Sequence, residues 1–511
     1  MFKLLAELHR AGLLTPTGLL RLLESVATTG ANPMVLLRVA AKLHPQRIAV
    51  SDDRQRLSYL ELWQQAESVA IGLHSDYGVR RGRKVAIACR DHSAAIKSIF
   101  AASRLGAHVF LINPGMSPDQ LMALHQWMQF DFWVYDEQLD AVFSDPSMRK
   151  KSLPAYHPTD ESIDRISSSP PREETRLKRA VAGNIVVMTG GTTGQPKSAS
   201  RKPSIFTFLP PFCALLTQVQ LARYRSVYIA TPLYHGFGLA SLFIGVVLRV
   251  TMYVSSRFDA ERACSLIEQE QVDVVTLVPL MLQRMLRHDS ASLSALQCIV
   301  SGGAALSPAL AQETLERIGP RLFNMYGTSE AGVCIIATPE MLRRKPESIG
   351  RPIAGVRARI SDVSDRVVGE RETGRLCIRS VWTTSRRSWI ETGDVAYRDR
   401  DGDLFLCGRV DDMIVSGGEN VYPIELENVL AQHPDIDSCG VVGIADSEFG
   451  QRLKAVITVK SGITIDESTL LEWLKPRLAR HQMPTVIEFR DELPYTALGK
   501  LDKRALREEG A

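Results

Sequence analysis

The stretch KVAIACRDHSAAIKSIFAASRLGAHVFLI, residues 84–112, contains the repeating unit that decides the fold. It opens with the apolar run 84–89 and closes with the apolar run 108–112. Between these runs, apolar side chains recur at helical spacing through Ile96, Phe100 and Leu105. Short apolar runs on either side of a helix are typical of a parallel strand–helix–strand crossover. The stretch therefore predicts two parallel strands joined by a helix.

The same alternation continues along the chain on the C-terminal side of this unit. A helix is predicted at 118–128, and strands at 131–136, 226–230, 272–278 and 296–303. Alternation of this kind predicts an α/β fold, with a large N-terminal body of mixed, mostly parallel sheets packed with helices. The segment 157–178 is polar, with clustered Ser and Pro, and is interpreted as an exposed connector.

The pattern changes near residue 356 to short strands and turns, including a hairpin turn at Asp401-Gly402. A small barrel-like β region is therefore predicted at 356–407. After residue 423 the order helix, strand, strand, helix, strand predicts a small α+β domain of about a hundred residues. The predicted domains are amphipathic helices at 1–44, a large domain at 45–409 and a C-terminal domain at 410–511.

Composition indicates a soluble globular protein and excludes several classes. The 511 residues are too many for one ordinary core, so at least two domains are expected. A net charge of +4 without a long basic run gives no support to nucleic-acid binding. The eight cysteines are scattered with no C-x-x-C pair, which indicates reduced thiols and a cytoplasmic location.

The first residues are apolar at helical spacing but carry charges, which excludes a membrane-spanning helix there. Two short amphipathic helices, broken near Thr15-Pro16, are predicted. They either pack on their own domain or dock at a membrane surface or a partner, which would make the protein peripheral at the membrane. The apolar stretch 239–254 is too short to span and is interrupted by Arg249, so it is predicted to be buried core.

A glycine- and threonine-rich loop, MTGGTTGQPKSASRK (188–202), follows an apolar run. Glycines let backbone N–H groups converge, threonine hydroxyls add donors, and Lys197 adds a positive charge, all of which suit an anion. The stretch matches the G-x-x-x-x-G-K-[ST] phosphate loop except that Pro196 replaces the second glycine. Because proline lacks an N–H and fixes φ, the loop is predicted to bind phosphate without leading into a helix.

Five further stretches follow in a fixed order: PLYHGFGL (232–239), SGGAAL (301–306), NMYGTSEAG (324–332), ETGDVAYRDRDGDLFLCGRVDDMIVSGGENVYP (391–423) and LPYTALGKLDKR (493–504). With the glycine-rich loop, they resemble the adenylate-forming superfamily of acyl-CoA synthetases, luciferases and peptide-synthetase adenylation domains. The resemblance spans about residue 45 to the C-terminus. It implies ATP, Mg²⁺ and coenzyme A, a mobile C-terminal domain, and two steps: formation of an acyl-adenylate, then displacement of AMP by a thiol.

The resemblance also implies roles for particular residues, carried over motif by motif. The loop expected to bind the β- and γ-phosphates consists of Thr189, Gly190, Gly191, Thr192, Thr193 and Lys197. The slot expected to hold the adenine is formed by Gly303, Ala304, Ala305, Asn324 and Tyr326. Asp394 and Arg409 are expected to bind the ribose. Glu330 matches the Mg²⁺ ligand, although alone it could equally begin a helix. Thr328 is expected on the α-phosphate.

Further matches concern the catalytic lysine of the first step, the change between steps and the second step. Lys500 matches the catalytic lysine that bridges the carboxylate and the α-phosphate, and Asp411 matches the hinge. Gly417 and Gly418 would line the path of the thiol. His235 matches the gate between the acyl pocket and the thiol tunnel, although a histidine among apolar residues is commonly a core group.

The resemblance is incomplete in places. Ser198 replaces a usual glycine and Arg375 stands where glutamate is frequent. The segment 379–391 is shorter than in most relatives, which could alter access to the site. The predicted function is an ATP-dependent acyl-CoA synthetase for a medium- or long-chain fatty acid, because the predicted acyl-pocket segments 236–248 and 278–285 are apolar. The alternatives are loading of a carrier protein, an aromatic acid, or a decayed nucleotide-binding regulator.

Overall fold

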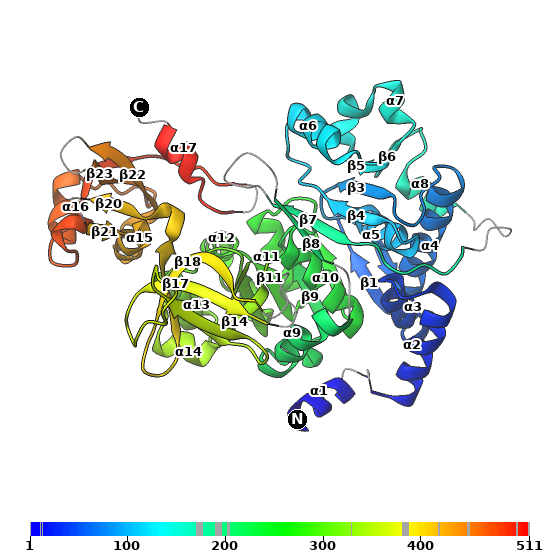
Figure 1. Cartoon of the computed structure of the whole chain (residues 1–511), viewed down its shortest axis with the longest axis horizontal. Helices are drawn as coiled ribbons and strands as arrows, with labels where there is room; N and C mark the ends of the chain where they lie inside the picture. The colour runs from blue at the N-terminus through cyan, green and yellow to red at the C-terminus, as the bar shows by residue number, and fades with distance from the viewer. Residues whose placement is uncertain are drawn as a thin grey trace. The chain divides into compact units, whose positions relative to one another are not determined.

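The computed structural model describes residues 2–10, 12, 14–169, 177–189, 197–201, 205–328, 330–380, 388–416, 419–446, 450–496 and 499–508. The chain divides into two compact units. Unit 1 comprises residues 1–277 and 291–299, and unit 2 comprises residues 278–290 and 300–511. Strand β12 (Cys298–Gly302) passes from the first unit into the second. Figure 1 shows the elements of both units coloured along the chain.

Unit 1 contains a six-stranded sheet in the order β6-β5-β3-β4-β7-β8. The strands are β3 (Lys84–Ala88), β4 (His108–Leu111), β5 (Phe132–Tyr135), β6 (Ser152–Pro154), β7 (Ile185–Thr189) and β8 (Lys197–Arg201). All neighbours are parallel except β7 and β8, which pair antiparallel. The predicted crossover between the runs 84–89 and 108–112 is confirmed, with α5 (Ser93–Arg104) as its helix.

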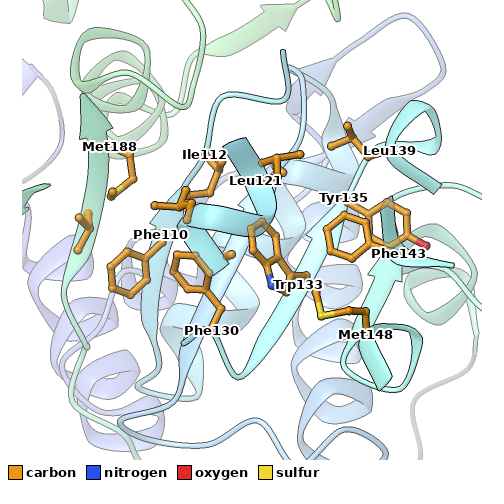
Figure 2. Close-up of a cluster of buried hydrophobic side chains, with 14 residues drawn as sticks. Phe110, Ile112, Leu121, Phe130, Trp133, Tyr135, Leu139, Phe143, Met148 and Met188 are labelled. Carbon is orange, nitrogen blue, oxygen red and sulfur yellow. The ribbon is translucent and has the colours of Figure 1, made fainter. Parts of the chain in front are cut away.

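The core of this sheet is built by side-chain alternation along its strands. One face carries Phe110, Trp133, Tyr135 and Met188, which pack with Phe130 (Figure 2). The helices α6 (Pro118–Met128) and α7 (Pro146–Arg149) and the 3₁₀ helix η1 (Glu137–Phe143) contribute apolar side chains to the same cluster. This aromatic core holds the parallel strands in register.

The helices α4 (Tyr59–Ser75), α5 and α8 (Ile163–Ser168) pack against one another. The helix α8 corrects the prediction that 157–178 is an exposed connector. Ser162 caps the helix by accepting from the Arg165 N–H, and Ile163 is fully buried. One buried isoleucine among polar residues was too weak a periodic signal to predict this helix from the sequence.

A second group of strands in unit 1 runs in the order β11-β9-β10-β1-β2. They are β1 (Ile48–Ser51), β2 (Arg56–Ser58), β9 (Ser226–Ile229), β10 (Thr251–Val254) and β11 (Val274–Leu277), parallel except for β1 with β2. The remaining helices of unit 1 are α1 (Phe2–Arg10), α2 (Pro16–Thr29), α3 (Met34–Leu43), α9 (Ile205–Gln218), η2 (Leu221–Arg223), α10 (Gly236–Leu248), α11 (Ala260–Gln269) and η3 (Ser292–Ala295). The predicted break at Thr15-Pro16 is confirmed, because Thr15 caps α2.

Unit 2 contains antiparallel strands in the order β16-β17-β18-β19-β15-β14-β13. They are β13 (Leu322–Thr328), β14 (Gly332–Ala337), β15 (Ser348–Pro352), β16 (Arg357–Ser361), β17 (Gly374–Arg379), β18 (Ile390–Arg398) and β19 (Leu404–Arg409), accompanied by helices α12 (Pro279–Asp289), α13 (Pro308–Arg317) and α14 (Pro339–Arg344). The predicted turn at Asp401-Gly402 joins β18 to β19, and Gly402 has φ +84°.

A smaller sheet of unit 2 is formed by β20 (Ile414–Ser416), β21 (Glu419–Val421), β22 (Ile436–Asp446), β23 (Gly450–Val459) and β24 (Pro484–Phe489). Its helices are η4 (Val410–Asp412), α15 (Pro423–Leu430), α16 (Glu467–Leu474), η5 (Arg480–Gln482) and α17 (Lys503–Glu508). The elements surround their own apolar core, which includes Leu426, Val441 and Leu470. The predicted α/β class, with a large multi-stranded body and a small C-terminal α+β part, is confirmed.

All eight cysteines are free thiols, as predicted. None of the helices that the structure describes has both the length and the apolar character needed to cross a bilayer. The stretch 239–254 forms most of α10 together with β10, and Arg249 between them is only 6% exposed.

Candidate functional site

Two distant segments of unit 2 meet at the side chains of Tyr326 in β13 and Asp394 in β18. The Tyr326 hydroxyl donates a hydrogen bond of 2.5 Å to Asp394 Oδ2. The other carboxylate oxygen, Oδ1, lies 3.5 Å from the Arg409 guanidinium. The structure thus brings together three of the predicted nucleotide-site residues.

The backbone conformation around Asp394 explains why Thr392 and Gly393 precede it in the sequence. Gly393 has φ +79°, and a Cβ there would lie 2.9 Å from the Arg409 guanidinium. The Asp394 N–H donates to the Thr392 hydroxyl oxygen, and that hydroxyl donates to the Leu376 carbonyl. Thr392 is a supporting residue that the sequence analysis missed, although its place beside Gly393 in the motif was a usable signal.

Burial governs the electrostatics of this group. It raises the pKa of Tyr326, and the adjacent Asp394 carboxylate raises it further. Burial also raises the pKa of Asp394, while the hydrogen bond from Tyr326 and the charges of Arg409 and Lys500 act in the opposite direction. A half-buried carboxylate of this kind is well placed to accept hydrogen bonds from a bound polyol.

Lys500 belongs to the same electrostatic group, although it lies far along the chain. Burial lowers the pKa of Lys500, Arg409 lowers it further, and Asp394 opposes both effects. A tight turn holds the residue, because the Lys500 N–H donates to the Thr496 hydroxyl and the Thr496 N–H donates to the Lys500 carbonyl. The charges of Asp394 and Arg409 thus act on a lysine whose backbone is held by these two bonds.

Gly499 is required by this turn for two reasons. Its φ of +66° lies in the left-handed region, and a Cβ there would lie 2.9 Å from Val278 Cγ2. The glycine of the Gly499-Lys500 pair therefore lets the lysine-bearing loop approach the residue before α12.

The hairpin between β13 and β14 carries the predicted phosphate and metal residues. Thr328 pairs with Gly332, and the Ala331 N–H donates a 3.1 Å hydrogen bond to the Thr328 hydroxyl. A Cβ on Gly327 would lie 2.2 Å from the Gly332 carbonyl oxygen, so the hairpin requires glycine there. Glu330 lies at the exposed tip. A carboxylate on an exposed tip suits a hard cation that keeps most of its water ligands.

The predicted adenine-slot residues follow or belong to β12 and β13. Gly303 has φ +80° and is exposed, Ala304 is half-buried and Ala305 is exposed. Asn324 is 6% exposed and pairs in β13 with Ala337 of β14. The exposed backbone after β12 is accessible to a ligand, whereas the Asn324 side chain is enclosed.

The strands on either side of the predicted phosphate loop pair with each other in unit 1. Thr189 at the end of β7 pairs with Lys197 at the start of β8. The prediction that no helix follows this loop is confirmed, because β8 returns antiparallel to β7. Gly190, Gly191, Thr192 and Thr193 lie outside the described residues, as do Gly417 and Gly418 on the predicted thiol path.

His235 precedes α10 in unit 1 as its N-cap residue. Its ring packs on Tyr234, with 4.5 Å between the ring centroids. The preceding Leu233 N–H donates a 2.8 Å hydrogen bond to the buried carboxylate of Asp91. Burial raises the pKa of Asp91 to about 8, helped by Asp136. Asp91 therefore anchors the His235 segment, a role the sequence analysis missed.

The predicted hinge lies at an exposed junction. Asp411 in η4 is exposed, and its carboxylate lies 3.9 Å from the Arg409 guanidinium. Across unit 2, Arg287 of α12 binds Asp437 of β22: its guanidinium lies 2.6 Å from the carboxylate and 2.8 Å from the carbonyl. Gln283 donates to the same carbonyl at 3.0 Å. These bonds fix the C-terminal sheet to α12 in the conformation described.

Two other clusters of potential metal ligands occur among the described residues, and both have internal partners. His92 Nε2 bonds Asp136, while His92 Nδ1 accepts from the Ala95 N–H, so neither nitrogen is left for a metal. The second cluster, the carboxylates of Asp399, Asp401 and Asp403, surrounds the Lys345 ammonium. Both clusters therefore have protein partners in place of a metal ion.

Residues 37–386 match the family model of AMP-binding enzymes, and residues 425–500 match the model of the AMP-binding enzyme C-terminal domain. A feruloyl-CoA synthase from Amycolatopsis sp is 31% identical over 488 residues, covering 91% of this chain and 96% of the relative. A 2-succinylbenzoate–CoA ligase from Bacillus cereus is 29% identical over 492 residues, covering 92% and 96%.

Solved structures show the same relationship. The amide bond synthetase McbA from Marinactinospora thermotolerans superimposes with a TM-score of 0.80 at 26% identity, covering 93% of this chain and 99% of that one. The o-succinylbenzoate CoA synthetase of Bacillus subtilis, in complex with ATP and magnesium, superimposes with a TM-score of 0.77 at 25% identity, covering 91% and 98%.

Proposed function

We propose, since the chain belongs to the AMP-binding enzyme family, that it is an AMP-forming acid–thiol ligase. It activates a carboxylic acid with ATP and passes the acyl group to coenzyme A. The observation that carries this proposal is the group of Tyr326, Asp394 and Arg409, joined by a 2.5 Å hydrogen bond and a 3.5 Å contact, whose charges act on the pKa of Lys500. Adenylation requires a positive charge beside groups that can hold the nucleoside, because negative charge grows on the α-phosphate oxygens during the attack.

In the first step a carboxylate oxygen attacks the α-phosphorus of ATP, and the bond to the departing pyrophosphate breaks. Lys500 holds the carboxylate and an α-phosphate oxygen together through its ammonium group, and Thr328 donates to the same phosphate. Glu330 would hold Mg²⁺, which neutralises charge on the phosphate oxygens. Preorganised positive charge at these oxygens lowers the barrier because the negative charge grows there during the attack.

The nucleoside is held by the group around Tyr326. Asp394 accepts hydrogen bonds from the ribose hydroxyls, Arg409 adds a donor, and the Tyr326 ring packs on the adenine beside the backbone of 303–305. Asn324 is proposed to bond the adenine amine. The phosphate-loop residues bind the β- and γ-phosphates through the hairpin that Thr189 and Lys197 close. The loop members proposed for this role are Thr189, Gly190, Gly191, Thr192, Thr193 and Lys197.

In the second step a thiol attacks the acyl carbon and AMP departs. The remaining roles inferred from the family belong to this step: Asp411 as hinge, His235 as gate, and Gly417 and Gly418 along the thiol path. The exposure of Asp411 supports the hinge, because an exposed residue can change its backbone torsions without disrupting a core.

For the acid we propose an aromatic carboxylic acid. The feruloyl-CoA and 2-succinylbenzoate–CoA ligases that resemble the chain are named for acids that contain an aromatic ring, and these relatives give no support to the fatty acid expected from the sequence. The apolar helix α10, in which Leu242 and Val246 are fully buried, does not separate a ring from an alkyl chain.

The test is pyrophosphate release with a panel of acids: ferulate, 2-succinylbenzoate and benzoate against hexanoate, dodecanoate and palmitate. Turnover with an aromatic acid, with CoA as acceptor, is expected. Preference for an alkanoate would overturn the aromatic assignment, and transfer only to a holo carrier protein would overturn the choice of acceptor. Absence of acid-dependent ATP–pyrophosphate exchange with every acid would instead indicate a nucleotide-binding regulator.

Lys500→Ala tests the mechanism. It is expected to abolish ATP–pyrophosphate exchange while largely sparing thioester formation from a preformed adenylate, because only the first step uses the lysine. Lys475→Ala, at an exposed lysine after α16, is the matched control. Equal loss of both reactions in Lys500→Ala would contradict the assigned role.

A further inference from the structure

The helix α2 of unit 1 has its apolar side facing outward. Leu19, Leu20, Leu23 and Val26 are 44%, 62%, 68% and 38% exposed. These four residues, called here the leucine face, occur at i, i+1, i+4 and i+7, so they lie on one side of the helix. The residues that α2 buries are Gly18, Ser25 and Thr29.

This arrangement reverses the usual one, in which the apolar stripe of a surface helix faces the core. The buried side is satisfied by polar contacts, since the Thr29 hydroxyl donates to the Ser25 carbonyl and the Asn32 amide donates to the carbonyls of Thr29 and Ala180. The polar side of α2 is therefore attached to the protein, and its leucine face needs a non-aqueous environment elsewhere.

The charge around α2 indicates which environment this is. Residues 1–44 contain five basic side chains and two acidic ones, so they contribute +3 of the net +4 of the whole chain. Both acidic residues are already paired, Glu7 with Arg10 and Glu24 with Arg21 and Lys42. A leucine face within a segment that carries a net charge of +3 is complementary to an anionic lipid surface.

A second copy of the chain is the competing occupant, and the area of the face argues against it. Four partly exposed side chains present about 300–400 Å², whereas a stable interface needs about 800 Å² per partner. Insertion of the same side chains at the lipid headgroup boundary needs no matching surface. The leucine face also precedes the region matched by the family model, which begins at residue 37.

We propose that the leucine face of α2 docks on anionic lipid bilayers, with its side chains inserted at the headgroup boundary and the net positive charge of 1–44 attracted to the headgroups. This surface is separate from the proposed ligase site, because no residue of that site lies in 1–44. Docking is thus expected to persist in a Lys500→Ala variant that has lost adenylation.

The experiment is flotation of the full chain with vesicles of phosphatidylcholine alone or with a quarter phosphatidylglycerol. The wild-type chain is expected to float with the anionic vesicles and to be released by high salt. The double substitution Leu20→Glu and Leu23→Glu is expected to weaken binding at least tenfold. The matched control is Val363→Glu with Val367→Glu, at residues of unit 2 that are 92% and 69% exposed.

Folding is checked by ATP–pyrophosphate exchange without vesicles, which the double substitution in α2 is expected to leave unchanged. Failure of the wild-type chain to float, or equal flotation of the α2 variant, would overturn the proposal. Light scattering during gel filtration provides the alternative outcome: a dimer that the α2 substitutions dissociate would assign the leucine face to a second copy and would also overturn it.

Discussion

The Tyr326 hydroxyl donates a 2.5 Å hydrogen bond to Asp394 across 68 residues of sequence, and this bond fixes the carboxylate proposed to bind ribose. Tyr326→Phe removes the donor, so the pKa of Asp394, already raised by burial, rises further. We expect the KM for ATP to increase about tenfold, because that is the typical effect of losing one hydrogen bond to a charged group.

The acidic limb of kcat/KM for ATP should also move to higher pH in Tyr326→Phe, since more of the Asp394 carboxyl is protonated at a given pH. Tyr397→Phe, at a tyrosine stacked on Phe405 in the same strand as Asp394, is the control. An unchanged KM and pH profile in Tyr326→Phe would remove Tyr326 and Asp394 from the nucleotide site.

Lys500 should impose an alkaline limit on adenylation. Desolvation and the charge of Arg409 lower its pKa, so the ammonium is lost at a lower pH than for an isolated lysine. We expect the rate of ATP–pyrophosphate exchange to decrease with rising pH, and this decrease should begin at a lower pH than the value near 10.5 at which ordinary lysines titrate. Lys500→Arg should exchange more slowly but lose this limb, because arginine stays charged. The same limb in Lys500→Arg and wild type would assign the titration to another group.

Glu330 at the tip of the β13–β14 hairpin should set the magnesium requirement. Glu330→Gln removes a charged oxygen ligand, and we expect the Mg²⁺ concentration for half-maximal exchange to rise roughly tenfold. Glu340→Gln, at an exposed glutamate of α14, provides the comparison. Identical magnesium titrations of wild type and Glu330→Gln would place the metal elsewhere.

The bonds between Arg287 and Asp437 should favour the adenylating conformation, since they attach the C-terminal sheet to α12 while Lys500 is in place. Asp437→Ala is expected to slow ATP–pyrophosphate exchange about two- to fivefold, because a partly exposed ion pair contributes a free energy of that size. Thioester formation from a preformed adenylate should not slow. Glu313→Ala, which removes an ion pair with Arg317 inside α13, is the control. Slowing of both reactions would indicate a general loss of structure.

Asp91 should make stability depend on pH. Burial raises its pKa to about 8, so between pH about 4 and about 8 the native state holds a proton that the unfolded chain has released. Stability from this group therefore falls as pH rises through that window. Asp91→Asn keeps an acceptor for the Leu233 N–H and removes the charge, so its advantage over wild type should grow to a few kcal/mol above pH 8.

Urea unfolding at pH 5, 7 and 8.5 measures this difference, with Asp119→Asn on the exposed side of α6 as the control. A constant difference between Asp91→Asn and wild type at all three pH values would show that Asp91 is ionised in the native state.

Much of the fold was predictable because it depends on local patterns. The apolar runs at 84–89 and 108–112 became β3 and β4, and Pro196 correctly predicted a loop that does not lead into a helix. The helix α8 was missed because only tertiary burial of Ile163 distinguishes it from a polar connector. Asp91 was missed because nothing near it in sequence indicates Leu233 as its partner.

By itself, the sequence determined the alternation of strands and helices in the large body and the family motifs, because apolar periodicity and turn chemistry are properties of neighbouring residues. Only the tertiary structure decided that Tyr326, Asp394, Arg409 and Lys500 share one electrostatic environment, and that the leucines of α2 face outward. Those relationships depend on burial and on approach between distant segments, and a linear pattern does not specify which side of a helix the rest of the chain will cover.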